Sequence, residues 1–373
     1  MPSVIVSEES PILGFYELAF HAPGTSYVRT YYRRPIGMLP GKVPPEILQR
    51  IVFSKLGRSD PDVILGPEIG EDAAVIKVGD QVVIAATDPI TGSLEDVGWL
   101  AVHVNANDIA TFGVSPRWFL ASVMLPPGYT PDQLGKIMNQ IDSAAKELDI
   151  AVTGGHSEIT ESVSQPIVVG FMMGIAPTGR YVTSSGAKPG DALIVTKTIG
   201  IEGTSILATE GASYLSNGVG KDIVEQGQNL KNSISVVKDG VTAFQTGFIH
   251  AMHDPTEGGL ANGVHEICDA SGVGCELEND LIPIHEATRK ICEYLQISPL
   301  ELISSGSMLI SCESRYASKV IDELNAVGID SAIIGLVTAD ATYRKVRLDG
   351  MLQNLPRPST DALWAALKKI SLS

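Results

Sequence analysis

The segment GEDAAVIKVGDQVVIAATDP, residues 70–89, places two apolar runs between acidic residues. Gly79-Asp80 separates the runs at residues 73–78 and 81–86, which predicts two strands joined by a tight turn. Glu71 and Asp72 precede the first strand, and Asp88 follows the second. Buried carboxylates are costly unless they are paired or bind a metal. The same segment therefore predicts a sheet and a polar site at its edge.

Three further polar segments, at residues 105–108 (NAND), 154–158 (GGHSE) and 253–259 (HDPTEGG), follow or interrupt apolar runs. Carboxylate and amide oxygens are the ligands that Mg²⁺ prefers, and bound Mg²⁺ holds nucleotide phosphates. Gly154 and Gly155 have no Cβ, so their backbone N–H groups can approach a phosphate closely. We interpret the five segments as one metal–phosphate site. Its candidate oxygen donors are Glu71, Asp72, Asp88, Asn107 and Asp108.

Each candidate also has an ordinary structural interpretation. Asp72 and Asp88 suit turns or helix caps. Asn107 and Asp108 lie inside a helical pattern, where a solvated face is the usual place for polar residues. Thr256 is a possible N-cap of the helix that follows it. The order and context of the five segments together favour the metal–phosphate interpretation.

The composition excludes several classes of function. A formal charge of −16 repels nucleic acid and anionic membranes, so we expect neither as a partner. The four cysteines form no CxxC pair and lie in or beside apolar segments, which favours reduced core cysteines over a zinc site or disulfides. No apolar run is long enough to span a bilayer and no secretory signal opens the chain, so we expect a cytoplasmic protein.

The 373 residues predict two or three domains. We divide the chain into an N-terminal extension (1–40), an N-terminal domain (41–180), a C-terminal domain (188–345) and a C-terminal tail (346–373). Turn-forming residues between 183 and 191 mark the domain boundary. For residues 1–37 we consider both a dispensable extension, with Met38 as an alternative start, and an ordered arm packed on the core.

Apolar periodicity predicts the elements between these boundaries. A helical pattern runs from Lys42 through Leu56, and Thr130 is the expected N-cap of a later helix. The polar, glycine-bearing residues 212–231 are expected to include a mobile loop. The other predicted helices are 99–112, 130–148, 258–270 and 314–327, and the predicted strands are 119–125, 150–153, 167–175, 192–196, 308–312 and 332–334.

No conventional phosphate loop is present: nothing matches GxxxxGK[ST], and no GxGxxG follows a strand. We therefore expect any nucleotide to bind through metal ions and exposed backbone amides.

Several of these segments resemble a known family. Residues 70–76 (GEDAAVI), 107–116 (NDIATFGVSP) and the pair Gly154-Gly155 resemble the N-terminal half of the aminoimidazole ribonucleotide (AIR) synthase superfamily. Residues 254–260 (DPTEGGL) and 304–310 (SSGSMLI) are most similar to its hydrogenase-maturation branch, HypE. The resemblance extends over residues 41–345.

The resemblance implies an α+β fold of two domains, with N-terminal strands of two subunits closing a shared barrel in a homodimer. ATP and Mg²⁺ are expected in a cleft where the N-terminal domain meets its partner. The implied roles are metal ligation by Glu71, Asp72, Asp88 and Asp108, nucleotide binding by Asn107, Gly154, Gly155 and His156, and catalysis at the γ-phosphate by Asp254, Thr256 and Glu257.

The resemblance also implies a reaction, in which ATP phosphorylates an amide-type oxygen and phosphate is then eliminated or displaced. In the HypE branch the substrate is a carbamoyl group on a C-terminal cysteine. Here residues 368–373 contain no cysteine, Glu257 stands where HypE has arginine, and Glu202 replaces a histidine. Serine is a far weaker nucleophile than a thiolate, so we do not expect self-carbamoylation.

We therefore expect an ATP- and Mg²⁺-dependent enzyme that acts on a carbonyl, amide or small acceptor, with hydrogenase maturation and a maturation partner protein as its possible setting. One alternative is a small-molecule kinase of the thiamine-monophosphate kinase type. The other is a non-catalytic nucleotide-binding assembly partner.

Overall fold

The computed structural model describes residues 4–6, 15–20, 28–33, 41–91 and 95–372. The chain divides into two compact units, Met1–Val43 and Pro44–Ser373. In the first unit, β1 (Val4–Val6), β2 (Phe15–Phe20) and β3 (Val28–Arg33) form an antiparallel sheet in that order. Met38, the alternative start, lies outside the described residues.

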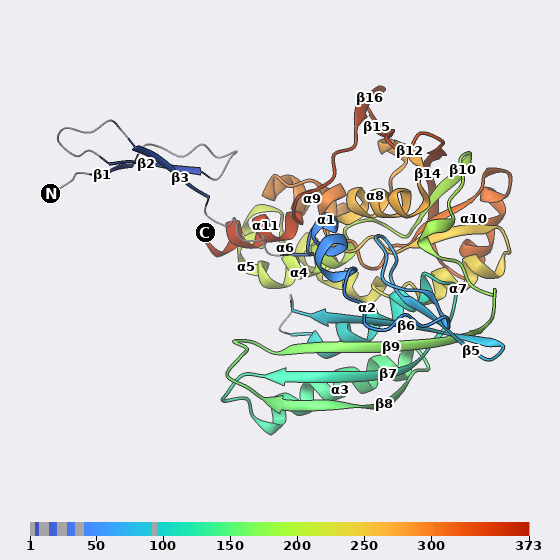
Figure 1. The fold of residues 1–373 in the computed structure, drawn as a ribbon, viewed down its shortest axis with the longest axis horizontal. Coiled ribbons are helices and arrows are strands. Elements are labelled where there is room, and N and C mark those ends of the chain that lie inside the picture. Colours follow the sequence, from blue (N-terminus) through green and yellow to red (C-terminus); the bar gives the residue numbers. More distant parts are fainter. Residues whose placement is uncertain (1–3, 7–14, 21–27, 34–40, 92–94, 373) are drawn as a thin grey trace. The chain divides into compact units, whose positions relative to one another are not determined.

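The second unit begins with a short helical segment, α1 (Pro45–Ile47) followed by the π-helix η1 (Leu48–Val52). The helical pattern predicted through Leu56 therefore ends four residues early, because residues 53–56 leave the helix. A six-stranded sheet follows, in the order β4-β5-β6-β9-β7-β8 (Figure 1). Its strands are β4 (Val63–Leu65), β5 (Ala74–Val78), β6 (Gln81–Ile90), β7 (Pro116–Leu125), β8 (Ala151–Ile159) and β9 (Ile167–Pro177).

The predicted hairpin is confirmed, since β5 and β6 pair antiparallel across Gly79-Asp80. The helix α3 (Pro131–Glu147) also forms as predicted. Thr130 accepts a hydrogen bond from the Gln133 backbone N–H, and the Gln133 side chain accepts one from the Thr130 N–H. This reciprocal capping box explains why the helix begins here.

The helix α2 (Val97–Ala110) is buried at every position except Trp99. It packs on β6 and β9 and also on α7 (Val237–Gln245) of the other half of the unit. The alternative interpretation of Asn107 and Asp108 as part of a solvated face is therefore wrong, because this helix is enclosed from both sides. A helix enclosed in this way shows little amphipathic pattern in its sequence.

A second sheet has seven strands in the order β11-β13-β10-β14-β12-β15-β16. Its strands are β10 (Asp191–Thr196), β11 (Ile249–His253), β12 (Gly274–Glu278), β13 (Leu309–Glu313), β14 (Ser331–Thr338), β15 (Arg344–Leu348) and β16 (Met351–Asn354). The same half of the unit contains four further helices: α8 (Gly259–Ser271), α9 (Glu286–Leu295), α10 (Ala317–Ala326) and α11 (Ala362–Ser371). Two of these elements, β16 and α11, lie in the segment predicted as a tail.

The loop expected within residues 212–231 is wrong, and one predicted strand is longer than expected. Residues 212–231 are largely helical, with α5 (Ala212–Gly218) and α6 (Lys221–Asn229) leading into η3 (Leu230–Ser233). These polar helices bury single apolar faces against α4 (Ile201–Glu210) and α9, which offsets their poor helix propensity. The strand predicted at 150–153 continues as β8 through the glycine pair to Ile159.

All four cysteines are buried free thiols, as predicted. In the part of the chain that the structure describes, no helix combines the length and the hydropathy needed to cross a bilayer.

Candidate metal and nucleotide site

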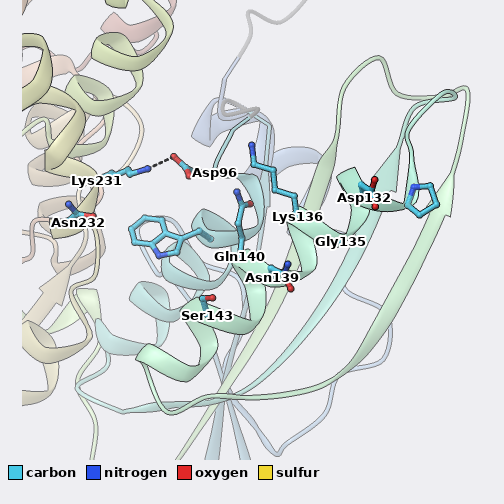
Figure 2. Close-up of a pocket in the computed structure, with 11 residues that line it drawn as sticks. Asp96, Asp132, Gly135, Lys136, Asn139, Gln140, Ser143, Lys231 and Asn232 are labelled. Carbon is cyan, nitrogen blue, oxygen red and sulfur yellow. Dashed lines mark hydrogen bonds and ion pairs between the residues drawn. The ribbon is translucent and has the colours of Figure 1, made fainter.

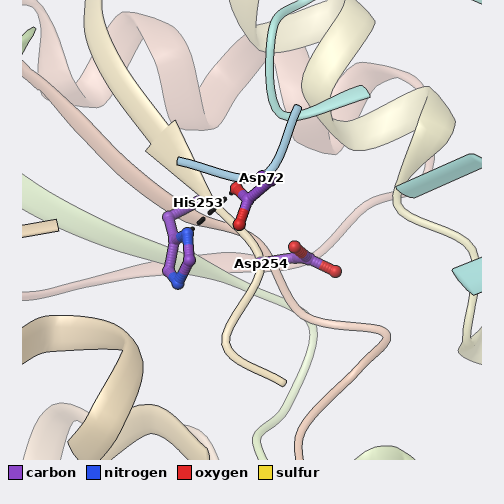
Figure 3. A group of neighbouring side chains, drawn as sticks. All are labelled: Asp72, His253 and Asp254. Atoms are coloured by element: carbon purple, nitrogen blue, oxygen red, sulfur yellow. Dashed lines mark hydrogen bonds and ion pairs between the residues drawn. The ribbon is translucent and has the colours of Figure 1, made fainter. Parts of the chain in front are cut away.

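Three side chains from distant parts of the sequence meet where the two sheets approach each other. Asp72 lies in the turn before β5, His253 ends β11, and Asp254 directly follows it. One ligand atom from each of these residues lies within 4.8 Å of the others (Figure 3). Two of the predicted polar segments, 181 residues apart at Asp72 and His253, thus form one cluster.

His253 organises the cluster from its interior, with only 1% of its surface exposed. Its Nδ1 lies 2.9 Å from Asp72 Oδ2, and its Nε2 lies 3.0 Å from Glu266 Oε2 on α8. Burial alone would lower the pKa of His253, but the carboxylates of Asp72 and Glu266 raise it well above its ordinary value. We infer that the imidazole is protonated and donates a hydrogen bond to each carboxylate.

The turn that carries Glu71 and Asp72 is held by backbone packing. Gly70 has a positive φ of 81°, and a Cβ there would lie 2.6 Å from the carbonyl oxygen of Glu266. Only glycine permits both this conformation and this close approach to α8. Asp72 is thereby placed beside the histidine, which is itself hydrogen-bonded to Glu266.

Ser184 connects this turn to the second sheet. Its backbone N–H donates to Glu71 Oε2 at 3.0 Å, and its hydroxyl donates to the Met252 carbonyl at 3.0 Å. Glu71 Oε1 is buried without a hydrogen-bond partner among the described residues, and burial raises the pKa of Glu71. A bound cation stabilises a buried carboxylate oxygen that lacks a hydrogen-bond donor.

The donor set fits Mg²⁺ better than a transition metal. Both ring nitrogens of His253 face carboxylates, so the imidazole does not offer a lone pair to a metal. The remaining donors of the cluster are carboxylate oxygens of Asp72 and Asp254, which are the hard ligands that Mg²⁺ prefers.

The helix α2 carries three of the polar residues predicted near this site, all buried. The Asn105 side chain holds the strand at Asp88: its Oδ1 accepts from the Asp88 N–H at 2.8 Å and its Nδ2 donates to the Asp88 carbonyl at 3.2 Å. Asn107 donates to the Ile234 carbonyl at 2.9 Å and accepts from the Val236 N–H at 2.8 Å. The structure thus shows Asn107 joining the two halves of the unit, and Asp108 buried one residue further on.

Gly154, Gly155 and His156 lie on the outer strand β8, away from the cluster. Gly155 pairs with Ala121, Ala121 with Gly170, and Gly170 with Asp88, so these residues form one row across the sheet. At about 4.8 Å per strand, Gly155 lies roughly 14 Å from Asp88. His156 is exposed and contacts Glu158 at 3.2 Å. Within one chain the glycine pair is not brought to the Asp72 cluster.

The segment after Asp254 is positioned by the C-terminal helix. Gly258 is the N-cap of α8 in a left-handed conformation, so the expectation that Thr256 caps this helix is wrong. Asp361, the N-cap of α11, accepts hydrogen bonds from the Gly258 N–H at 2.6 Å and the Leu363 N–H at 2.7 Å. Trp364 Nε1 donates to Glu257 Oε1 at 3.2 Å. Residues 257–258 are therefore anchored to α11.

Replacing Asp361 by alanine is expected to destabilise the protein by about 2–4 kcal/mol, since it removes a helix cap and leaves the buried Gly258 N–H unpaired. Chemical denaturation measures this free energy. Asp132→Ala, which removes an exposed first-turn acid of α3 that is not its cap, should cost less than about 1 kcal/mol. Equal effects of the two substitutions would contradict the anchoring role of Asp361.

Sequence reasoning missed three residues of this site. The sequence pattern placed His253 in a polar segment but assigned no role to it, and it indicated neither Glu266 nor Ser184. Glu266 lies within a predicted helix. Ser184 lies among the turn-forming residues that mark the predicted domain boundary. The one available signal for His253 was its position next to Asp254 at the end of an apolar strand.

Comparison with known proteins shows the family of this chain. The sequence profiles described as AIR synthase related protein, N-terminal domain and C-terminal domain, match residues 70–176 and 188–346. A hydrogenase expression/formation protein, HupE, of Azotobacter chroococcum mcd 1 is 30% identical over 282 residues, covering 73% of this chain and 80% of the relative. The chain belongs to the AIR synthase-related family. The family resemblance predicted from the sequence is thereby confirmed.

Another relative within this family is the carbamoyl dehydratase HypE of Azotobacter vinelandii, 30% identical over 277 residues, with 72% of this chain and 78% of that protein covered. Among solved structures, the HypE–HypF complex contains a chain with a TM-score of 0.69 at 22% identity, covering 84% of this chain and 99% of that one. A HypE structure in complex with ATP gives a TM-score of 0.62 at 19% identity, covering 87% and 98%. These structural likenesses show a shared fold and confirm the predicted two-domain AIR synthase-like α+β architecture.

Proposed function

We propose that this AIR synthase-related protein is an ATP- and Mg²⁺-dependent enzyme that phosphorylates the oxygen of a carbonyl, amide or other small acceptor. The observation that carries the proposal is the convergence of Asp72 and Asp254, from two separate polar segments, into one cluster of oxygen donors. Support comes from the relative named carbamoyl dehydratase and from the related fold that was solved with ATP.

In this proposal Asp72, Asp254 and Glu71 hold Mg²⁺, with Asp88 and Asp108 on the neighbouring strand and helix. When bound, Mg²⁺ neutralises phosphate charge during phosphoryl transfer. His253 keeps Asp72 ionised and oriented, because it presents a positive charge 2.9 Å from the carboxylate. The segment from Thr256 to Glu257 is the proposed contact for the transferred phosphoryl group.

The nucleotide contacts predicted on β8 require a second subunit in this proposal. Gly154, Gly155 and His156 lie on an outer strand whose residues are all exposed. We propose that a homodimer forms through this sheet and that the β8 segment contributes to the nucleotide site from there. Unpaired strand edges and half-exposed apolar residues such as Val152 and Phe171 suit such an interface.

The acceptor distinguishes two forms of the reaction. A HypE-type reaction would remove water from a carbamoyl group and release inorganic phosphate, with a HypF-like partner supplying the carbamoyl group. A kinase would leave phosphate on its product, and a thiamine-phosphate kinase structure, ThiL with AMPPCP and TMP, shares the fold with a TM-score of 0.60 at 22% identity, covering 77% of this chain and 89% of that one. The kinase candidate is favoured by the burial of all four cysteines of this chain, which leaves none of them as an accessible carrier thiol.

The proposal is tested by incubating purified protein with ATP and Mg²⁺ and a panel of primary amides, carbamoyl compounds and small alcohols. We expect one acceptor class to stimulate ADP formation at least tenfold, and chelation of Mg²⁺ to remove the stimulation. Phosphorus NMR then separates free phosphate from a phosphorylated product. Tight ATP binding without ADP formation across the panel would contradict an enzymatic role and favour an assembly partner.

A further inference from the structure

A polar groove ends at Glu202, whose carboxyl group is buried and near enough to the carboxyls of Asp88 and Glu257 for burial and then their charges to raise its pKa. Its outer part, about 660 Å³, is lined by the start of α2, one face of α3 and the residues Lys231 and Asn232 (Figure 2). Its inner end, about 20 Å³, is lined by α4, and Glu202 belongs to it. Asp96, Trp99 and Lys231 line both parts, so the two are continuous.

Glu202 is the unusual residue of this groove. It is 8% exposed, and its Oε2 has no hydrogen-bond partner among the described residues. Burial raises the pKa of this carboxyl, and the Ser305 side chain is the neighbouring group that lowers it. Leaving a buried carboxylate oxygen without a donor is costly, so a hydrogen-bond donor on a bound molecule would be stabilised at Glu202 Oε2.

The charges that surround Glu202 decide which donor fits. Burial, and then the nearby carboxyls of Asp361, Asp88 and Glu257, raise the pKa of Glu202 to about 7. Two lysines line the groove, and both are ion-paired: Lys231 with Asp96 at 2.9 Å and Lys136 with Glu95 at 2.6 Å. The potential at the inner end therefore favours a hydrogen-bond-donating nitrogen over any anionic or purely accepting group.

The size and shape of the groove further restrict the class of ligand that it can bind. A space of about 20 Å³ admits one water-sized group, such as an NH₂. Trp99 presents an aromatic side chain between the inner and outer parts, and a planar group packs well against an indole ring. The larger outer part leaves room for the body of a small molecule.

We propose that this groove is the acceptor site, and that Glu202 Oε2 accepts a hydrogen bond from the NH₂ of a planar primary amide, whose oxygen is the atom phosphorylated in the proposed reaction. The inference rests on the proposed function, since it identifies the class of acceptor for the proposed phosphoryl transfer. It also assigns a role to Glu202 at the position where the sequence departs from the histidine of HypE.

Three probes of the same shape test this inference: benzamidine, benzamide and benzoate, titrated calorimetrically into the full-length protein without nucleotide. We expect benzamidine to bind at least tenfold more tightly than benzoate, with benzamide between them, because an ionic hydrogen bond to a buried carboxylate is strong. Glu202→Gln should weaken benzamidine at least tenfold. Glu225→Gln, on the exposed face of α6 and outside the groove lining, should change it less than about twofold.

Equal binding of the three probes, or no binding of any of them, would overturn the inference and indicate that a water molecule satisfies Glu202. A crystal structure with benzamidine provides a second measurement that does not depend on a variant: its nitrogen should lie within hydrogen-bonding distance of Glu202 Oε2. Because no nucleotide is present, failure of ATP turnover leaves this result intact, and failure of probe binding leaves the ATP assay intact.

Discussion

Asp72→Asn is expected to weaken Mg²⁺-dependent ATP binding at least 100-fold. The substitution is nearly isosteric, and the asparagine oxygen can still accept a hydrogen bond from His253, so the fold should persist. It removes the negative charge of one of the oxygen donors in the cluster with Asp254. Calorimetric titration of ATP in the presence and absence of Mg²⁺ measures the effect, which should be confined to the Mg²⁺-dependent part.

Asp142→Asn is the matched control, because Asp142 is an exposed carboxylate that pairs with Lys146 on the surface of α3. It should leave ATP binding within about twofold of the parent, since exposed ion pairs contribute little. Mg²⁺-ATP affinity that survives in Asp72→Asn would rule out this cluster as the metal site. The same titration of Asp108→Asn tests whether the predicted ligand on α2 belongs to the site.

His253→Ala is expected to lower the free energy of unfolding by about 3–5 kcal/mol, the typical cost of removing one partner from a buried ion pair. The variant leaves the Asp72 and Glu266 carboxylates, 11% and 13% exposed, without the cation that separates them. Urea unfolding measures the loss, and an unchanged dependence on denaturant concentration would show that the unfolded state is not altered.

The chain offers a matched control for this variant. His156 also contacts a carboxylate, that of Glu158, but the two side chains are 66% and 46% exposed. His156→Ala should therefore cost less than about 1 kcal/mol. If both histidine variants lose the same small amount, the buried cluster does not stabilise the fold in the way we infer.

Features that depend on interactions between residues close in the sequence were predicted correctly. Features that depend on packing between distant segments were missed. The hairpin at residues 74–90 and the helix α3 depend on turn residues, apolar spacing and a capping box within a few residues, and both formed as expected. The helices at residues 212–229 were missed because their stability comes from packing against α4 and α9. The burial of α2 was missed for the same reason, since its second neighbour lies more than a hundred residues away in the sequence.

The candidate site shows the same division. Acids at strand ends indicated Asp72 and Asp254, and the geometry places them together. The roles of Glu71, Asp88, Asp108 and the β8 glycines stay predictions. Nothing local indicated Glu266 or Ser184, because Glu266 lies inside a predicted helix and Ser184 lies among turn-forming residues that predicted only a boundary.

By itself, the sequence determined the family, the hairpin, the capped helix and the residue types from which an oxygen-rich site is made. Only the tertiary structure decided that His253 lies between Asp72 and Glu266, that Asn107 holds residues 234–236, and that Glu202 faces a groove. The physical reason is that hydrogen bonds and charge pairs between distant segments depend on how the two sheets pack together. That packing is specified by the whole core and by no single stretch of sequence.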